Sequence, residues 1–203
     1  CDLLWSLAFN NPLLKEVIGQ QGGIPIIIRG MKMHPGSTDF LKSACGALSN
    51  MCQNAQNQTL IATHGGIFCM VQVLENHCAH TLLLPFVFDA IASLIVGNQD
   101  NGRKVSEAGA IQSILSLMEE HVAHAELVKS GCHALAILSD NRGEGAKIAS
   151  AGGVKVLLPV LRAHPQQVDL HRVAAVVLLR MLQEAPVASD MARARGVPLM
   201  LTV

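Results

Sequence analysis

Two pairs of histidines have a spacing that suggests metal binding. His77 and His80 lie in the stretch LENHCAH, and His121 and His124 lie in MEEHVAH. Imidazole nitrogens bind zinc, and Cys78 between the first two histidines adds a thiol, another ligand type that zinc accepts. The pattern indicates either a metal site shared by the two pairs or a structural feature that recurs along the chain.

The histidines belong to a longer series with a regular period. His34, His77, His121 and His164 follow one another at intervals of 43 or 44 residues. Apolar residues recur with the same period at relative positions 0, 3, 4 and 7, which lie on one face of a helix. The first of these positions holds Ile24, Ile67, Ile111, Val154 and Val197. Such a period is typical of repeat architectures, so the recurrence is explained by the fold before any chemistry.

Each unit of the repeat predicts three helices. A short apolar-periodic segment precedes a glycine turn, which allows a sharp reversal because glycine reaches positive φ. The turns are Gly22-Gly23, Gly65-Gly66, Gly109, Gly152-Gly153 and Gly196. The helix with the apolar face follows each turn, and a longer Ala/Leu-rich helix such as TDFLKSACGALSNMCQ ends the unit.

Three helices per unit, the glycine turn and the ALSN stretch resemble the armadillo repeat. The closest match is residues 141–182, and the resemblance covers the entire chain. It implies an all-α fold, a right-handed superhelical solenoid. HEAT repeats, which lack the short first helix, are the alternative.

The period divides the chain into repeats of a single expected domain, residues 1–203. These segments are a partial repeat 1–10, repeats 11–53, 54–97, 98–140 and 141–183, and a partial repeat 184–203. Since a solenoid needs polar caps at both ends, we expect a segment of a larger protein.

The composition excludes several classes of partner. Fifteen basic residues balance fifteen acidic ones, which argues against nucleic acid. The longest apolar run, residues 81–97, is interrupted by Pro85 and Asp89, so we expect no membrane insertion. The six cysteines form no CxxC pair and are expected in the core of an intracellular protein, in the cytoplasm with the nucleus as an additional location.

No pattern of residues predicts catalysis or a cofactor. The chain has no P-loop, G-x-S-x-G or H-E-x-x-H motif. A histidine just past the second helix can bond that helix's last free carbonyls. Repeats stack about 8–10 Å apart, too far for one histidine per repeat to share a zinc ion. We therefore expect no enzyme activity, no metal, no cofactor and no small-molecule substrate, and the edge formed by the two histidine pairs has no assigned role.

The resemblance implies a non-enzymatic scaffold that binds a protein or an extended peptide in a concave groove lined by the third helices. Peptide-binding members carry an Asn near the end of the third helix, and import carriers add a Trp one turn earlier. The Asn position here holds Asn50, Ser93, Ile137 and Arg180, and the Trp position holds Gly46, Asp89, His133 and Val176. The import-carrier pattern is therefore absent, and Trp5 is expected in the core.

The expected partner-binding residues come from these positions and from one turn on either side. They are Lys42, Ser43, Gly46, Asn50, Asp89, Ser93, Lys129, Ser130, His133, Arg172 and Arg180. Their mixed polarity favours a peptide of mixed or moderately acidic character. Two alternatives remain: a regulatory appendage of a larger multidomain enzyme or signalling protein, and a metal- or redox-responsive sensor that uses the His/Cys edge.

Overall fold

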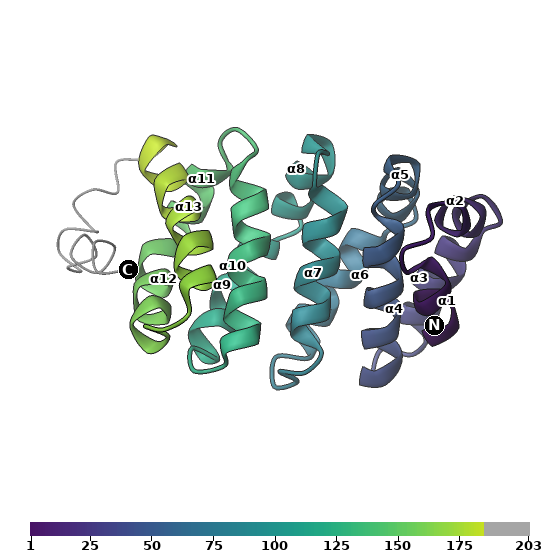
Figure 1. The fold of residues 1–203 in the computed structure, drawn as a ribbon, viewed down its shortest axis with the longest axis horizontal. Coiled ribbons are helices and arrows are strands. Elements are labelled where there is room, and N and C mark those ends of the chain that lie inside the picture. The colour runs from purple at the N-terminus through teal and green to yellow at the C-terminus, as the bar shows by residue number, and fades with distance from the viewer. Residues whose placement is uncertain (185–203) are drawn as a thin grey trace. The chain divides into compact units, whose positions relative to one another are not determined.

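The structure, a computed structural model, describes residues 1–184, and this range contains helices and no strands (Figure 1). The helices are α1 (Asp2–Ala8), α2 (Pro12–Gln20), α3 (Gly23–Met33), α4 (Thr38–Met51), α5 (Ala55–Thr63), α6 (Gly66–Asn76), α7 (Leu84–Ile95), α8 (Gln99–Glu107), α9 (Ala110–Glu120), α10 (Ala125–Ser139), α11 (Glu144–Ser150), α12 (Gly153–Ala163) and α13 (Val168–Glu184).

The helices follow the predicted repeats three at a time. Segments 11–53, 54–97 and 98–140 each contain one short and two longer helices, and segment 141–183 contains α11, α12 and all but the last residue of α13. The short first helices α2, α5, α8 and α11 distinguish this fold from HEAT repeats. The predicted partial repeat 184–203, with Gly196 and Val197, lies outside the described residues apart from Glu184.

The helices cluster into two compact units, and the single domain that the period predicts stays a prediction. Unit 1 is Cys1–Gly109 and unit 2 is Ala110–Val203, so the boundary falls between the first and second helices of the third repeat. Helices α1–α8 belong to unit 1, and α9–α13 belong to unit 2.

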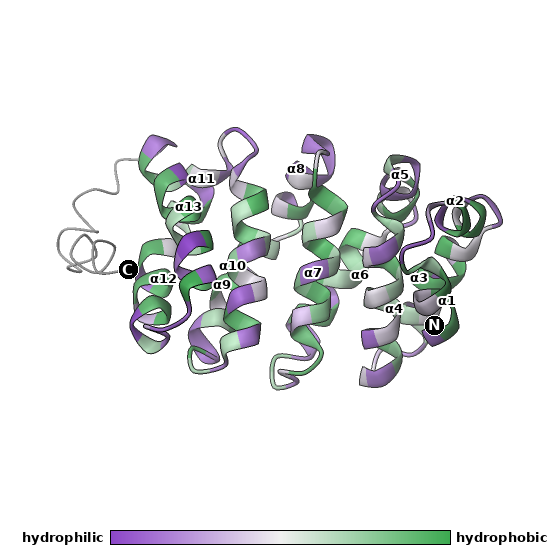
Figure 2. Cartoon of the chain, viewed as in Figure 1, coloured by the Kyte–Doolittle hydropathy of each residue, from purple (hydrophilic) through white to green (hydrophobic). Residues whose placement is uncertain are grey.

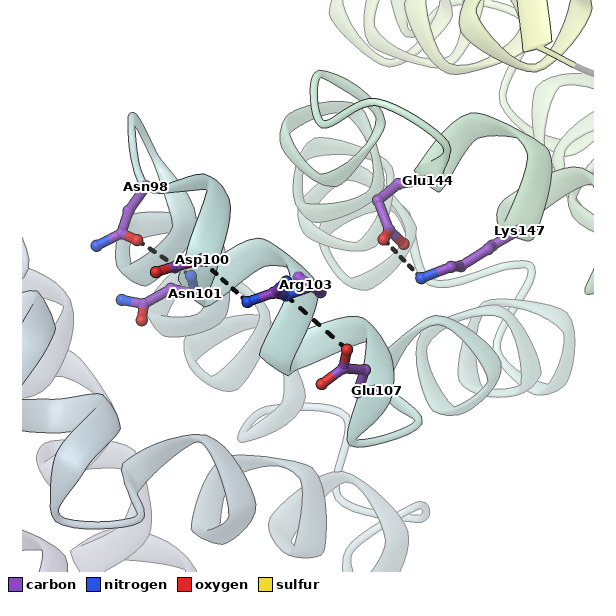
Figure 3. A network of polar contacts seen from close by, with 7 residues as sticks. All are labelled: Asn98, Asp100, Asn101, Arg103, Glu107, Glu144 and Lys147. Carbon is purple, nitrogen blue, oxygen red and sulfur yellow. Dashed lines mark hydrogen bonds and ion pairs between the residues drawn. The ribbon is translucent and has the colours of Figure 1, made fainter.

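Local sequence signals explain where the helices begin. The side chains of Asn11, Asn54 and Asn98 each accept hydrogen bonds from backbone N–H groups in the first turn of the helix that follows. Figure 3 shows this cap at α8, where Asn98 accepts from the N–H of Asn101 at 3.0 Å. Between first and second helices the chain turns through a left-handed glycine, such as Gly65 with φ of 82°.

The predicted apolar face of the second helices forms the core. Ile24, Ile67, Ile111 and Val154 are all buried. Figure 2 shows hydrophobic and hydrophilic bands alternating along the helices, as expected when each helix buries one face.

A second asparagine in the first helices ties neighbouring repeats together within unit 1. Asn57 donates from Nδ2 to the carbonyls of Lys15 at 2.9 Å and Met51 at 3.2 Å. Asn101, one repeat later, donates to the carbonyls of Gln58 at 3.4 Å and Leu94 at 3.1 Å.

In unit 2 the same position holds Glu144. Its Oε1 accepts from Lys147 at 2.7 Å, a contact drawn in Figure 3, while its buried Oε2 has no hydrogen-bond partner. The asparagine bonds of unit 1 are therefore not repeated by this carboxylate.

Candidate partner-binding face

The third helices of unit 1 form one face, on which α4 lies between α1 and α7. Trp5 of α1 meets Phe86 of α7 edge to face, with ring centroids 5.5 Å apart and an interplanar angle of 87°. The Trp5 ring lies directly over Gly46 of α4, where a Cβ would come within 2.6 Å of a ring atom. Side chains from the two flanking helices thus meet across the middle one, and both rings are partly exposed there.

Lys42 of α4 lies at the same place. Its ammonium is 4.8 Å from the centroid of the Phe86 ring, a distance typical of a cation–π interaction. Beside it is a recess of about 300 Å³ between the start of α4 and the link that precedes α7. Polar and charged side chains there include Asp39, Lys42 and His80.

The side chains at the position predicted to grip a peptide make contacts between successive repeats. Asn50 donates from Nδ2 to the carbonyl of Trp5 at 3.1 Å, and the hydroxyl of Ser93 lies 2.9 Å from that of Ser49. In unit 2, Arg180 pairs with Asp140 at 3.0 Å. Three of the four side chains at this position of the third helices, those of Asn50, Ser93 and Arg180, therefore contact the preceding third helix or the residue directly after it.

Ser43, seven residues before Asn50, faces the preceding helix as well. Its hydroxyl contacts the carboxylate of Asp2 and lies 3.0 Å from the carbonyl oxygen of Asp39. All four expected residues of α4 are thus engaged within the chain, because Gly46 lies beneath Trp5 and Lys42 lies over Phe86.

The other expected residues are more accessible. Asp89 is exposed on α7 in unit 1, and Lys129 and His133 are exposed on α10 in unit 2, with Ser130 partly buried between them. Arg172 is exposed on α13 and pairs with Asp169 at 3.3 Å. Unit 2 therefore presents a separate set of basic side chains on its third helices.

Sequence reasoning missed Phe86 and placed Trp5 in the core, whereas both rings are partly exposed. The available signal was Gly46, which leaves space on an otherwise side-chain-covered helix. The sequence did not show which aromatic ring would fill the space over Gly46.

The recurring histidines connect links of successive repeats. Within unit 1, Nε2 of His77 lies 2.7 Å from the carbonyl oxygen of Pro35, and within unit 2, Nε2 of His164 lies 2.7 Å from that of Val122. Because a carbonyl only accepts, Nε2 is the donor in both bonds. The acceptor is therefore in the preceding repeat and not, as expected, at the end of the histidine's own helix.

The two histidine pairs make different contacts. The rings of His77 and His80 have centroids 5.5 Å apart, and Nδ1 of His124 accepts from the backbone N–H of Leu127 at 3.4 Å. Within residues 1–184, no three His, Cys, Asp or Glu side chains are grouped so that they could hold a metal ion.

Four cysteines are buried, and burial suppresses their reactivity. It raises the pKa of the Cys45 thiol and that of the Cys132 thiol to about 12, and it raises the pKa of Cys52 and Cys69 as well. The thiolate is the reactive form, so these side chains are suited to packing rather than to redox chemistry.

No helix of the described chain combines the length and apolar character needed to cross a membrane. The two other recesses found in unit 1 measure about 220 and 300 Å³. These volumes are at or below the lower limit of ordinary small-molecule sites.

Stacked three-helix repeats with an open face lined by the third helices define an armadillo-type scaffold. The chain belongs to the armadillo-repeat family described as the GAC ARM domain, whose model matches residues 37–203.

Relatives and solved structures agree with this assignment. Human armadillo repeat-containing protein 6 is 23% identical over 132 residues, which are 62% of this chain and 26% of that protein. Protein aardvark of Dictyostelium discoideum is 32% identical over 89 residues, 38% of this chain and 12% of that protein. This chain therefore spans about a quarter or less of these relatives.

Among solved structures, an engineered protein matches with a TM-score of 0.83 at 20% identity. The match covers 98% of this chain and 78% of the engineered protein. A designed armadillo repeat protein in complex with the peptide (KR)4 has a TM-score of 0.58 at 16% identity, covering 88% of this chain and 90% of its own. The predicted all-α armadillo solenoid is confirmed.

Proposed function

We propose that this chain is a non-enzymatic scaffold that binds an extended peptide, or an extended segment of a partner protein, along the third helices of its repeats. The observation that carries the proposal is the contact of Trp5 with Phe86 over Gly46, which brings partly exposed aromatic rings of α1 and α7 together on the third-helix face of unit 1. Partly exposed aromatic side chains are typical anchors of protein interfaces. A designed armadillo protein of similar fold binds the peptide (KR)4.

The same features favour a polypeptide over other ligands. The overall charge is balanced, so no basic surface dominates that would attract nucleic acid. The recesses of unit 1 are small, which favours a partner that lies over the surface rather than a small-molecule substrate. Burial and a raised pKa make Cys45 and Cys132 poor redox sensors, so a sensor would have to use the exposed Cys78 beside His77.

A second candidate is that the scaffold works as a regulatory appendage of a larger enzyme or signalling protein. It is favoured by the small fraction of the relatives, 26% and 12%, that the matches cover. We propose a cytoplasmic location with the nucleus as an additional compartment, which microscopy of a fluorescently labelled full-length protein would test.

Peptide binding is tested by selecting from a displayed library of random peptides about nine residues long, which are long enough to span three third helices. The purified chain is compared with two double variants. Phe86→Ala with His133→Ala changes one third helix of each unit. Phe68→Ala with Gln112→Ala is the matched control, since both residues are exposed on the second helices α6 and α9.

We expect the third-helix variant to lose about tenfold or more in affinity for the selected peptides, at a melting temperature close to that of its parent. The control should bind like the parent. The proposal is wrong if the library yields no binding peptide, or if only the second-helix variant loses binding.

A further inference from the structure

The aromatic pair on unit 1 is partly exposed to solvent. The whole chain has one Trp, five Phe and no Tyr, and Trp5 and Phe86 meet at a single point of the third-helix face. In an edge-to-face pair, the edge of one ring points at the face of the other. Ring faces carry the negative part of the ring quadrupole and therefore attract cations.

A cation of the chain itself already lies on one of these faces. The Lys42 ammonium is 4.8 Å from the Phe86 centroid, and within residues 1–184 it has no carboxylate at ion-pair distance. The Phe86 ring is thus the group with which the Lys42 ammonium interacts.

Carboxylates outnumber ammonium groups around the rings. Asp2 precedes Trp5 by three residues on α1, Asp39 precedes Lys42 by three on α4, and Asp89 follows Phe86 by three on α7. Residues three apart lie on the same side of a helix, so α1 and α7 each carry a carboxylate on the side of their ring, and α4 carries one on the side of Lys42. Against them stands the single ammonium of Lys42, so the local charge favours a cationic ligand.

We propose that the Trp5–Phe86 pair is a subsite for a Lys or Arg side chain of an extended partner, and that Lys42 occupies this subsite until the partner displaces it. The proposal rests on the proposed function and specifies its ligand for unit 1. It differs from the mixed or moderately acidic peptide that the sequence favours for the whole face.

The spacing of the helices also predicts how basic residues should be spaced along the partner. Neighbouring helices pack about 8–10 Å apart, and three residues of extended chain span about 10 Å. A second basic residue three positions along the partner would therefore reach the carboxylate of the adjacent third helix.

The test uses two synthetic peptides of about nine residues, one with Arg at every third position in a Gly/Ser background and one with Glu at the same positions. Calorimetry gives the affinity. Fluorescence of Trp5, the only tryptophan of the chain, reports whether the peptide binds at the ring pair.

We expect the Arg peptide to bind and to change Trp5 fluorescence, while the Glu peptide does not bind. Phe86→Leu keeps an apolar side chain but removes the ring, and should weaken Arg-peptide binding about tenfold. Lys42→Met removes the internal competitor and should strengthen it several-fold.

Two matched variants control for general effects. Phe68→Leu removes an exposed ring from α6, and Lys32→Met removes an exposed charge from α3. Neither should change the affinity as much as its counterpart on the third helices.

The subsite proposal is overturned if the Glu peptide binds as tightly as the Arg peptide, or if Lys42→Met leaves the affinity unchanged or lowers it. If library-selected peptides still bind the third-helix face but contain no basic residues, the subsite is wrong and the scaffold function stands. If no peptide of any kind binds, both proposals fail.

Discussion

Replacing Asn57 by Ala should destabilise unit 1 strongly. The side chain is 2% exposed, and its amide donates to the carbonyls of Lys15 and Met51 at 2.9 and 3.2 Å. Truncation removes both of these hydrogen bonds, while the carbonyl of Met51 keeps its bond from the backbone N–H of Asn54 at 3.1 Å. Each lost bond contributes about 0.5–1.5 kcal/mol, so the free energy of unfolding should fall by about 1–3 kcal/mol.

Urea unfolding measures this change. Trp5 is the only tryptophan and lies in unit 1, so its fluorescence follows this unit while circular dichroism follows all helices. With a urea dependence of about 2 kcal/mol per M, the fluorescence midpoint should fall by about 0.5–1.5 M.

Gln56→Ala is the matched control for Asn57→Ala. Gln56 is the neighbouring residue on α5 and its side chain is exposed, so its truncation should change stability by less than about 0.5 kcal/mol. If Asn57→Ala unfolds like this control, the bonds between the first helices do not stabilise the stack, and their role has been misjudged.

Two further predictions concern the histidines and the thiols. His77→Ala should lower the stability of unit 1 by about 1 kcal/mol, because the bond to the Pro35 carbonyl is lost. The parent should contain no stoichiometric zinc. Zinc that is present in the parent and disappears in the variant would contradict the structural role of His77. Burial raises the pKa of Cys45 from 9.0 to about 12, so the unfolded chain releases the thiol proton at a lower pH than the folded chain. The stability that is present below about pH 9 should therefore decline as the pH rises toward 12, by up to about 1.4 kcal/mol per pH unit. Urea midpoints measured from about pH 8 to 11 should fall less steeply in Cys45→Ala, and equal slopes would show that the thiol is not protected in the folded state.

The fold could be predicted because its determinants are local and repeated. The apolar positions of the second helices, such as Ile24 and Ile67, recur at a fixed interval, and each set defines one helix face without reference to any distant residue. The division into two units was not predictable in this way, since the apolar period continues across Gly109 without interruption.

The site was predictable only as far as its helix. Helical periodicity assigns Asn50 to one face of α4, but it does not say whether that face meets solvent or the preceding third helix. The bond from Asn50 to the Trp5 carbonyl depends on how far α1 rotates against α4. The Trp5–Phe86 contact depends in addition on how α1 and α7 pack on either side of α4, because the two rings meet over Gly46.

Because Asn50, Ser93 and Arg180 contact the preceding repeat, we propose that partner recognition depends more on the neighbouring position of each third helix. A side chain that already bonds the preceding helix gains little from a partner, because one hydrogen bond would only replace another. The position one turn earlier holds Gly46, Asp89, His133 and Val176, and the last three side chains are exposed in their units. Asp89 is acidic, His133 carries an imidazole and Val176 is apolar. At Gly46 the Trp5 ring lies above the helix. Each repeat therefore presents a chemically different group at the same structural position, and a scaffold of nearly identical helices can select one partner sequence over another.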